Sequence, residues 1–201
     1  MAGERARVAV FVSGRGSDLQ ALIDASKDGR LEARIVLVVS GSPDAYGFIR
    51  AAANRINTFV FVRKSYPSLE EADRVLLNKL KEHHIGYVAM AGYLKMMPAA
   101  ILRAYPQRVV NIHPALLPAY GGQGMYGQRV HEAVLAHGEK ESGVTVHLAD
   151  EVYDHGKILE QVRVPVLPDD TPDTLAARVL DEEHKLYPIA LNKLIKGEYK
   201  L

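Results

Sequence analysis

The chain has 201 residues, of which 48% are hydrophobic and 24% are charged, and these values are ordinary for one globular domain. It contains no cysteine, which excludes disulfide scaffolds, thiolate metal sites and cysteine nucleophiles. Its 25 basic and 24 acidic side chains give a formal net charge of +1 without a basic block, which argues against nucleic acid as a main partner.

The N-terminal segment holds one short apolar run, residues 8–12, before the polar Ser13. Five apolar residues are too few for a secretory signal, which needs about 7–15, or for a membrane span, which needs about 20. We therefore expect a soluble, cytoplasmic protein without a membrane partner.

Short apolar runs alternate with amphipathic segments through the first two-thirds of the chain. We predict strands at 8–12, 35–39, 59–62, 87–91 and 108–112, and helices at 17–27, 45–55 and 68–82. Ser68 followed by Glu71 is the pattern of a capping box that begins the third helix. Continuous Val- and Ile-rich strands separated by single helices predict an α/β fold, a mostly parallel sheet with helices on both faces.

The pattern changes after Pro114. A glycine-rich loop at 121–127 precedes a helix that ends near His137, and strands at 144–148 and 158–164 are joined by the turn 150–156, which predicts an antiparallel addition to the sheet. Thr171 and Pro172 are typical of a helix start, and Pro188 should kink or break that helix. The chain shows no repeat or linker, so we predict a single domain over residues 1–201.

Ligands of open parallel sheets bind beyond the carboxyl ends of the strands, which selects the loops 13–18, 92–97 and 111–120. The first, S-G-R-G-S-D, is a glycine turn leading into a helix N-terminus, where free N–H groups and the helix dipole suit a phosphate. Leu19 takes the place of the third glycine of a dinucleotide fingerprint, and the Walker sequence is absent. The loop indicates one phosphate on a small substrate, with a plain tight turn as the alternative.

Asn111 and His113 lie two residues apart at the end of a strand, so their side chains point the same way. An amide donor beside an imidazole can hold a carbonyl oxygen and move its proton. A buried histidine with a loop-capping asparagine is the alternative. The turn 150–156 is rich in carboxylates, and these are either exposed turn formers or, if the turn folds back, include one that orients His113 and keeps it protonated.

The spacing of the eight histidines does not indicate a metal site. His83 and His84 are adjacent, and His131 and His137 are six residues apart, so neither pair shares one face of a helix. The chain also lacks the G-x-S-x-G elbow of many serine hydrolases. We therefore expect no metal and no serine nucleophile of that kind.

Several motifs occur in order along the chain: S-G-R-G-S at 13–17, A-G-Y-L-K-M-M at 91–97, N-I-H-P-A-L-L-P-A-Y at 111–120, H-L-A-D-E-V-Y-D-H-G at 147–156 and E-H-K-L-Y-P at 183–188. Together they resemble the phosphoribosylglycinamide formyltransferases, the folate-dependent family also called glycinamide ribonucleotide transformylases, over essentially the whole chain. The resemblance implies a Rossmann-like formyltransferase fold. It also implies transfer of a formyl group from the co-substrate 10-formyltetrahydrofolate to the amine of glycinamide ribonucleotide, in de novo purine (IMP) biosynthesis and without a metal.

The resemblance further implies roles for individual residues. The catalytic trio is Asn111, His113 and Asp154, with His113 as general acid and its pKa raised by Asp154. The residues for the phosphate and ribose of the ribonucleotide are Gly16, Ser17, Asp18 and Glu183. The folate-binding residues are Met90, Leu94, Lys95, Met96, Met97, Asn111 and Asp150. Methionines at such spacing are otherwise core residues.

The chain departs from the family pattern in three places. Asp18 stands where asparagine is usual, and a carboxylate there would repel phosphate unless it caps the helix. Leu69 stands where many members place an arginine for the folate tail, which leaves Lys64 or Arg63 as substitutes. The loop 121–127 is longer than in many members.

Two other functions are considered. A related formyltransferase or a formyl hydrolase would share the fold, but such relatives carry a further domain that a chain of this length does not accommodate. A non-catalytic nucleotide-binding module would not need the intact trio. The expected partners are the two small substrates, glycinamide ribonucleotide and the folate, and a homodimer is one assembly that the sequence leaves open.

Overall fold

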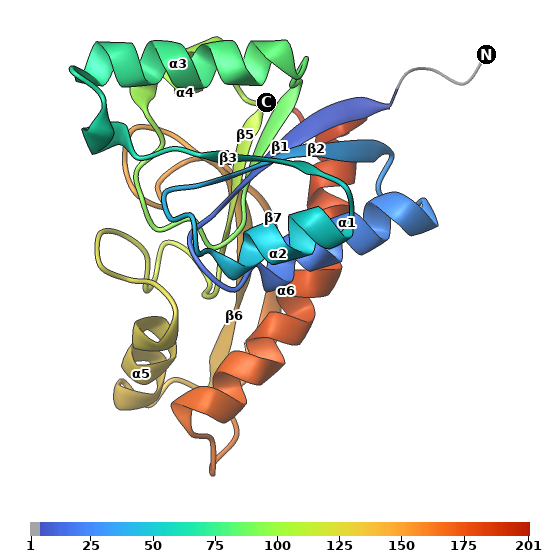
Figure 1. Cartoon of the computed structure of the whole chain (residues 1–201). Coiled ribbons are helices and arrows are strands. Elements are labelled where there is room, and N and C mark those ends of the chain that lie inside the picture. Colours follow the sequence, from blue (N-terminus) through green and yellow to red (C-terminus); the bar gives the residue numbers. More distant parts are fainter. Residues whose placement is uncertain (1–4) are drawn as a thin grey trace.

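A seven-stranded sheet runs through the computed structural model, which describes residues 5–201 (Figure 1). The strands are β1 (Ala6–Val12), β2 (Ala33–Ser40), β3 (Asn57–Val60), β4 (Tyr87–Met90), β5 (Val109–His113), β6 (Glu141–Leu148) and β7 (Ile158–Pro165). They lie in the order β3-β2-β1-β4-β5-β6-β7. The first five strands are mutually parallel, and β6 and β7 add to β5 in antiparallel fashion, which confirms the predicted fold class.

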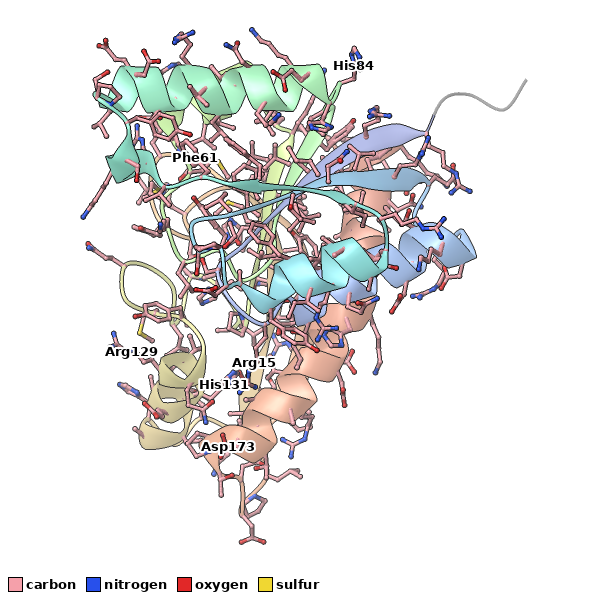
Figure 2. The ribbon with its side chains drawn as sticks, in the orientation of Figure 1. Arg15, Phe61, His84, Arg129, His131 and Asp173 are labelled. Atoms are coloured by element: carbon pink, nitrogen blue, oxygen red, sulfur yellow. The ribbon has the colours of Figure 1, made fainter. Side chains whose placement is uncertain are left out.

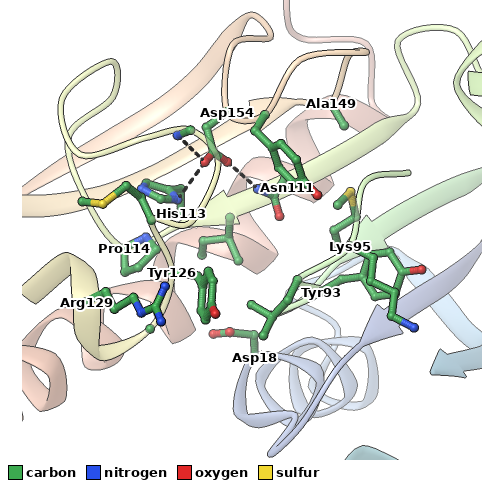
Figure 3. Close-up of a pocket in the computed structure, with 18 of the residues that line it drawn as sticks. Asp18, Tyr93, Lys95, Asn111, His113, Pro114, Tyr126, Arg129, Ala149 and Asp154 are labelled. Carbon is green, nitrogen blue, oxygen red and sulfur yellow. Dashed lines mark hydrogen bonds and ion pairs between the residues drawn. The ribbon is translucent and has the colours of Figure 1, made fainter. Parts of the chain in front are cut away.

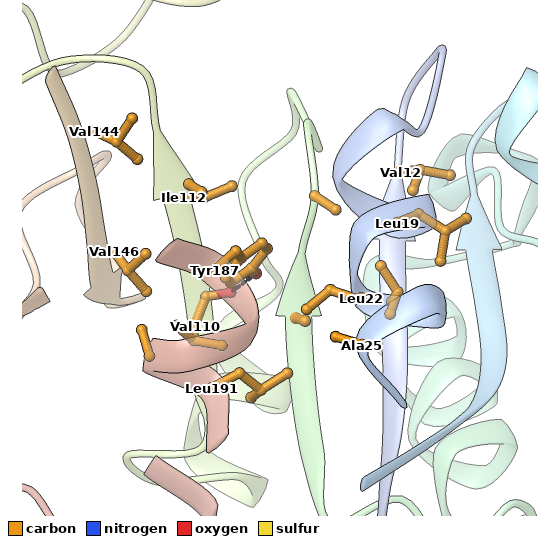
Figure 4. Packing of buried hydrophobic residues seen from close by; sticks show 14 of the residues in the cluster. Val12, Leu19, Leu22, Ala25, Val110, Ile112, Val144, Val146, Tyr187 and Leu191 are labelled. Carbon is orange, nitrogen blue, oxygen red and sulfur yellow. Dashed lines mark hydrogen bonds between the residues drawn. The ribbon is translucent and has the colours of Figure 1, made fainter. Parts of the chain in front are cut away.

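Helices cover both faces of the sheet. α1 (Ser17–Asp28), α2 (Tyr46–Ala53), α5 (Gln128–Ala136) and α6 (Pro172–Ile195) contribute to the apolar cluster on one face, and α3 (Leu69–Glu82) and α4 (Ala99–Ala104) to that on the other. Figure 4 shows part of the first cluster, in which Leu191 of α6 lies beside Val110 and Val146 of the sheet and Leu19 of α1 lies beside Val12. Removal of these side chains from water is the main stabilising contribution, because the strands are apolar on both faces.

The main differences from the predicted elements are short segments. The sequence analysis misses α4 and a single 3₁₀ turn at Arg63–Ser65, and it places β3 two residues too late. α4 has six residues and follows Pro98, so it presents less than two turns of periodic pattern. The differences leave the order of the elements unchanged.

Two predicted helix starts form as hydrogen-bonded caps, one of them only in part. Ser68 Oγ accepts a hydrogen bond from the Glu71 N–H at 3.1 Å, but the Glu71 carboxylate pairs with Arg74 instead of returning to Ser68. Half of the predicted capping box therefore forms at α3. At α6, Thr171 and Thr174 complete a reciprocal box, with Pro172 at the first helical position.

Of the kink or break expected at Pro188, the break does not occur. α6 continues through Pro188 to Ile195, although proline removes one backbone donor. Buried side chains on both sides of it, among them Tyr187 and Leu191, hold the helix against the sheet. Packing therefore outweighs the lost hydrogen bond. Within residues 5–201, no helix has the length and apolar character needed to span a membrane.

The order of the strands places a switch point between β1 and β4, from which the chain proceeds in opposite directions along the sheet. The loops after these strands are tied together: the Ser13 N–H donates to the Gly92 carbonyl at 3.1 Å, and Ser13 Oγ accepts from the Leu94 N–H at 2.9 Å. Open α/β sheets bind their ligands at such a point.

Candidate active site

A cavity of about 730 Å³ lies at the carboxyl ends of β1, β4 and β5. Its walls include the N-terminus of α1, the loop 92–97, the glycine-rich loop after residue 121, the turn 149–154 and part of α6. Every site residue expected from the sequence lines this cavity except Gly16, the residue directly before Ser17. The fold thus brings segments from both ends of the chain to one place.

The loop before α1 has the geometry of an anion site. Gly16 is the N-cap residue, with a left-handed φ of 67°, and no side chain caps this helix. The first N–H groups of α1 have no carbonyl partners within the helix, because the first intrahelical bond runs from the Gln20 N–H to the Gly16 carbonyl. A Cβ on Gly16 would lie 3.0 Å from the Gly47 Cα, so this position requires glycine both for φ and for space.

A side chain of Asp18 that capped α1 would explain why a carboxylate lies beside a phosphate site. No such cap forms. Asp18 is 8% exposed and lines the cavity together with Glu183, which is also 8% exposed. Burial raises the pKa of Asp18 to about 6. Burial, and then the neighbouring Asp18, raise the pKa of Glu183 well above its ordinary value.

The predicted trio comes together through the folded-back turn 150–156 (Figure 3). Asp154, whose backbone φ is 56°, places Oδ2 at 3.5 Å from His113 Nδ1. The same oxygen accepts a hydrogen bond from the Gly122 N–H at 3.0 Å, and Oδ1 accepts from Asn111 Nδ2 at 3.3 Å. Burial acts to raise the pKa of Asp154, but its hydrogen bonds and the neighbouring histidines outweigh burial and lower it. Asp154 is therefore a carboxylate at neutral pH.

His113 is buried with oxygen atoms facing both of its ring nitrogens. Nε2 lies 2.7 Å from the Tyr120 carbonyl, and Nδ1 faces Asp154. Burial lowers the pKa of His113, against the opposing effects of the Asp154 charge and the Tyr120 carbonyl. The expected raised pKa is therefore wrong: Asp154 acts in the predicted direction, but removal of the imidazolium from water has the larger effect.

Sequence reasoning missed His147, a buried residue of β6 that lies opposite Asn111 in the register of the sheet. His147 Nδ1 is 2.9 Å from the Leu148 carbonyl, which can only accept, so Nδ1 carries a proton. In the neutral ring Nε2 then accepts from Asn111 Nδ2 at 3.1 Å. The sequence does show His147 as a polar residue inside the largely apolar run 144–148. Its proximity to Asn111 becomes apparent only when β6 is paired with β5.

The candidate folate segment forms the opposite wall of the cavity. Met97 is almost fully buried, whereas Leu94 is 48% exposed at the rim. The side chain of Lys95 is exposed and has no ion-pair partner within residues 5–201. Asp150 lines the cavity and also stabilises its own turn, since it accepts from the Val152 N–H at 2.8 Å.

Arg63 and Lys64, the expected substitutes for the missing arginine near residue 69, differ in whether their charge is already paired within the protein. Arg63 makes two hydrogen bonds, of 2.9 and 2.8 Å, to the Asp73 carboxylate. Lys64 is exposed, as is Leu69. None of the three lines the cavity. In the described part of the chain, no group of three or more histidine, aspartate or glutamate side chains is arranged to hold a metal ion.

Comparison with known proteins identifies similar chains over nearly the full length. The formyl transferase family matches residues 6–191. A chloroplastic phosphoribosylglycinamide formyltransferase of Arabidopsis thaliana is 45% identical over 91% of this chain, which spans 63% of the plant protein. The phosphoribosylglycinamide formyltransferase of Haemophilus influenzae is 35% identical over 97% of this chain and 90% of its own. The crystal structure of glycinamide ribonucleotide transformylase 1 from Symbiobacterium toebii superposes with a TM-score of 0.89 at 37% identity, over 97% of this chain and 90% of that one.

Proposed function

The chain belongs to the formyl transferase family, and from this premise we propose that it transfers the formyl group of 10-formyltetrahydrofolate to the amine of glycinamide ribonucleotide, in de novo purine biosynthesis. The observation that carries the proposal is the meeting of Asn111, His113 and Asp154 in one cavity with an uncapped helix N-terminus. A formyl donor and a phosphorylated amine can then be held side by side. Named relatives with the same activity support this assignment.

The reaction begins when the substrate amine attacks the formyl carbon, and negative charge develops on the formyl oxygen. An amide N–H of Asn111 and a proton on His113 can stabilise that charge if they lie within hydrogen-bond reach. When the tetrahedral intermediate collapses, the bond from the carbon to the folate nitrogen breaks and that nitrogen takes up a proton. The attacking amine loses one, so the proton count balances.

Both donors have partners within the protein, which constrains this mechanism. Asn111 Nδ2 contacts His147 and Asp154, and His113 Nε2 contacts the Tyr120 carbonyl. Each group must therefore exchange a protein acceptor for the substrate oxygen. We assign the loop 121–127 a part in this exchange, because Gly122 donates to Asp154 and the loop lines the same cavity.

We extend the proposal to the remaining features expected from the sequence. Residues 1–201 form one formyltransferase domain, supported by the family match to 6–191 and by the single sheet. The two small molecules are the partners, and a net charge of +1 offers no attraction for nucleic acid. The cytoplasm is the proposed compartment, and a homodimer is the assembly to test first by sedimentation.

The test is an assay of formyl release from 10-formyltetrahydrofolate with and without glycinamide ribonucleotide. We expect release only when the ribonucleotide is present, with a formylated ribonucleotide as the product. Equal release in its absence would identify a hydrolase with the same fold. Binding of the ribonucleotide without any release would identify a nucleotide-binding module.

A further inference from the structure

Two buried carboxyl groups line the part of the cavity assigned to the ribonucleotide. Asp18 lies in the first turn of α1, Glu183 lies in α6, and the two helices pack against each other. Both residues are more than nine-tenths buried and both line the cavity, and Figure 3 shows Asp18 there. Asp18 Oδ1 is buried and has no hydrogen-bond partner. Such an atom is costly unless a ligand or a proton satisfies it.

No lysine or arginine within residues 5–201 lies within 4.0 Å of either carboxylate. The nearest base is His184, whose Nε2 lies 3.8 Å from Asp18 Oδ1, and neither atom is hydrogen-bonded. Burial lowers the pKa of His184, so this imidazole is neutral at pH 7 and does not supply the missing positive charge.

Other titratable groups lie around Asp18 and Glu183, on each of the elements that pack against them. Figure 2 shows Arg15, from the loop before α1, and Arg129 and His131 of α5, all of which line the same cavity. Arg50 of α2 and Asp181 of α6 act on His184 with opposite charges. On the sheet side, the Tyr187 hydroxyl donates to the Met90 carbonyl, and its pKa is raised well above its ordinary value, first by burial. None of the arginines forms an ion pair with Asp18 or Glu183.

Two buried carboxylates without a cation cannot both ionise near neutral pH, because each charge raises the free energy of the other in a medium of low dielectric constant. The proton belongs to the pair rather than to one residue. A phosphate placed at the N-terminus of α1 would bring further negative charge to the pair and would favour its protonated form.

We propose that the Asp18–Glu183 pair holds one proton in the free protein at neutral pH and takes up a second when glycinamide ribonucleotide binds, so that Asp18 meets the nucleotide as a neutral carboxylic acid. The inference rests on the proposed function, since it assigns the ribonucleotide to this end of the cavity. It also accounts for a carboxyl residue at a position where the family pattern has an amide: a protonated aspartate is, like asparagine, an uncharged donor and acceptor.

The sign of the linkage fixes the expected pH dependence. A ligand whose binding takes up a proton binds more weakly as pH rises. The dissociation constant should therefore increase by up to tenfold per pH unit above the pKa of the free pair, until the pair in the complex also loses its proton. The phosphate and the amine of the free ribonucleotide also titrate, but the free ligand is the same in every experiment, so its titration cancels in a comparison of variants.

The experiment measures binding of glycinamide ribonucleotide by calorimetry between pH 5.5 and 8.5, in buffers of different ionisation enthalpy, for the wild type, Asp18→Asn and Glu183→Gln. The wild type should take up close to one proton more at pH 7 than Asp18→Asn, and its dissociation constant should rise more steeply with pH. Equal proton uptake by the two proteins would overturn the inference while leaving the proposed function intact. Absence of binding to the wild type would overturn both.

A second measurement needs no ligand. Infrared difference spectra of the free protein at pH 7 should contain a protonated-carboxyl band that Glu183→Gln abolishes or shifts. A wild-type spectrum with ionised carboxylates alone would overturn the first half of the proposal. Circular dichroism of each variant reports whether the fold is retained.

Discussion

At the scale of single residues, the polar groups of the proposed reaction centre already have partners within the protein. The two amide hydrogens of Asn111 point toward His147 and Asp154, and His113 lies between Asp154 and the Tyr120 carbonyl. Such a network holds each group in place before substrate arrives. It also means that a substitution at one member changes the protonation or the orientation of another.

The first residue-scale prediction concerns Asp154→Asn. The Asp154 charge raises the pKa of His113 against burial, so its removal should lower that pKa further. If protonated His113 is the active form, the alkaline limb of the pH–rate profile should move to lower pH by the same amount. The measurement is kcat against pH for the wild type and the variant. Coincident alkaline limbs would mean that Asp154 does not tune His113.

The second residue-scale prediction concerns His147, which we describe as a positioning residue because it acts through Asn111. His147→Ala removes the acceptor that orients the amide, and kcat should fall roughly tenfold, the rate equivalent of about 1.4 kcal/mol, with little change in KM. His147→Gln retains an acceptor and should restore part of the rate. A loss that appears in KM alone, or no difference between the two variants, would contradict the positioning role.

These residues also show where sequence reasoning reaches its limit. Asn111, His113 and Asp154 were predicted from their motifs, and the cavity collects them. His147 was not, because its proximity to Asn111 depends on the pairing of two antiparallel strands. The direction of the His113 pKa was also wrong, because the degree of burial of an imidazole is a property of the whole fold.

At the scale of elements, the buried hydroxyl of Tyr187 joins α6 to two neighbouring strands, β4 and β5. It contacts the Met90 carbonyl at 2.9 Å and the Val110 carbonyl at 3.1 Å, one residue before Asn111 in β5 (Figure 4). The continuous Val- and Ile-rich runs predicted most strands within two residues. The passage of α6 through Pro188 was not predictable, because it depends on packing that no local pattern contains.

Tyr187→Phe tests this connection. The substitution preserves the ring but removes the donor from two buried carbonyls, and it should lower the free energy of unfolding by about 1–2 kcal/mol. Thermal or denaturant unfolding measures the change. Tyr199→Phe is the matched control, because that hydroxyl donates to Glu160 in a partly exposed setting, and its loss should cost less. An equal loss of unfolding free energy at both positions would show that the buried hydrogen bonds of Tyr187 stabilise the fold no more than the partly exposed one of Tyr199.

At the scale of the whole molecule, the cavity joins parts of the chain that are distant in sequence. Ser17 and Glu183 line its proposed ribonucleotide end, and the segment 94–97 and Asp150 line the proposed folate end. A ligand at either end contacts elements that separate on unfolding. Each ligand should therefore stabilise the entire fold rather than one loop, and by an amount set by its own affinity.

The last prediction follows from this arrangement. At about 100 times its dissociation constant, each ligand should stabilise the protein by about 2.7 kcal/mol, which corresponds to an increase in Tm of roughly 5–10 °C for a chain of this size. Glycinamide ribonucleotide and a non-reactive folate analogue should raise Tm additively if they occupy separate ends.

Lys95→Ala should reduce the Tm shift from the folate analogue alone, and by less at high salt, because the lysine is exposed. Lys81→Ala, an exposed lysine of α3 outside the cavity, is the matched control and should change neither shift. A folate shift that is unchanged in Lys95→Ala would remove Lys95 from the proposed site, and ligands that compete instead of adding would show that the two ends are one.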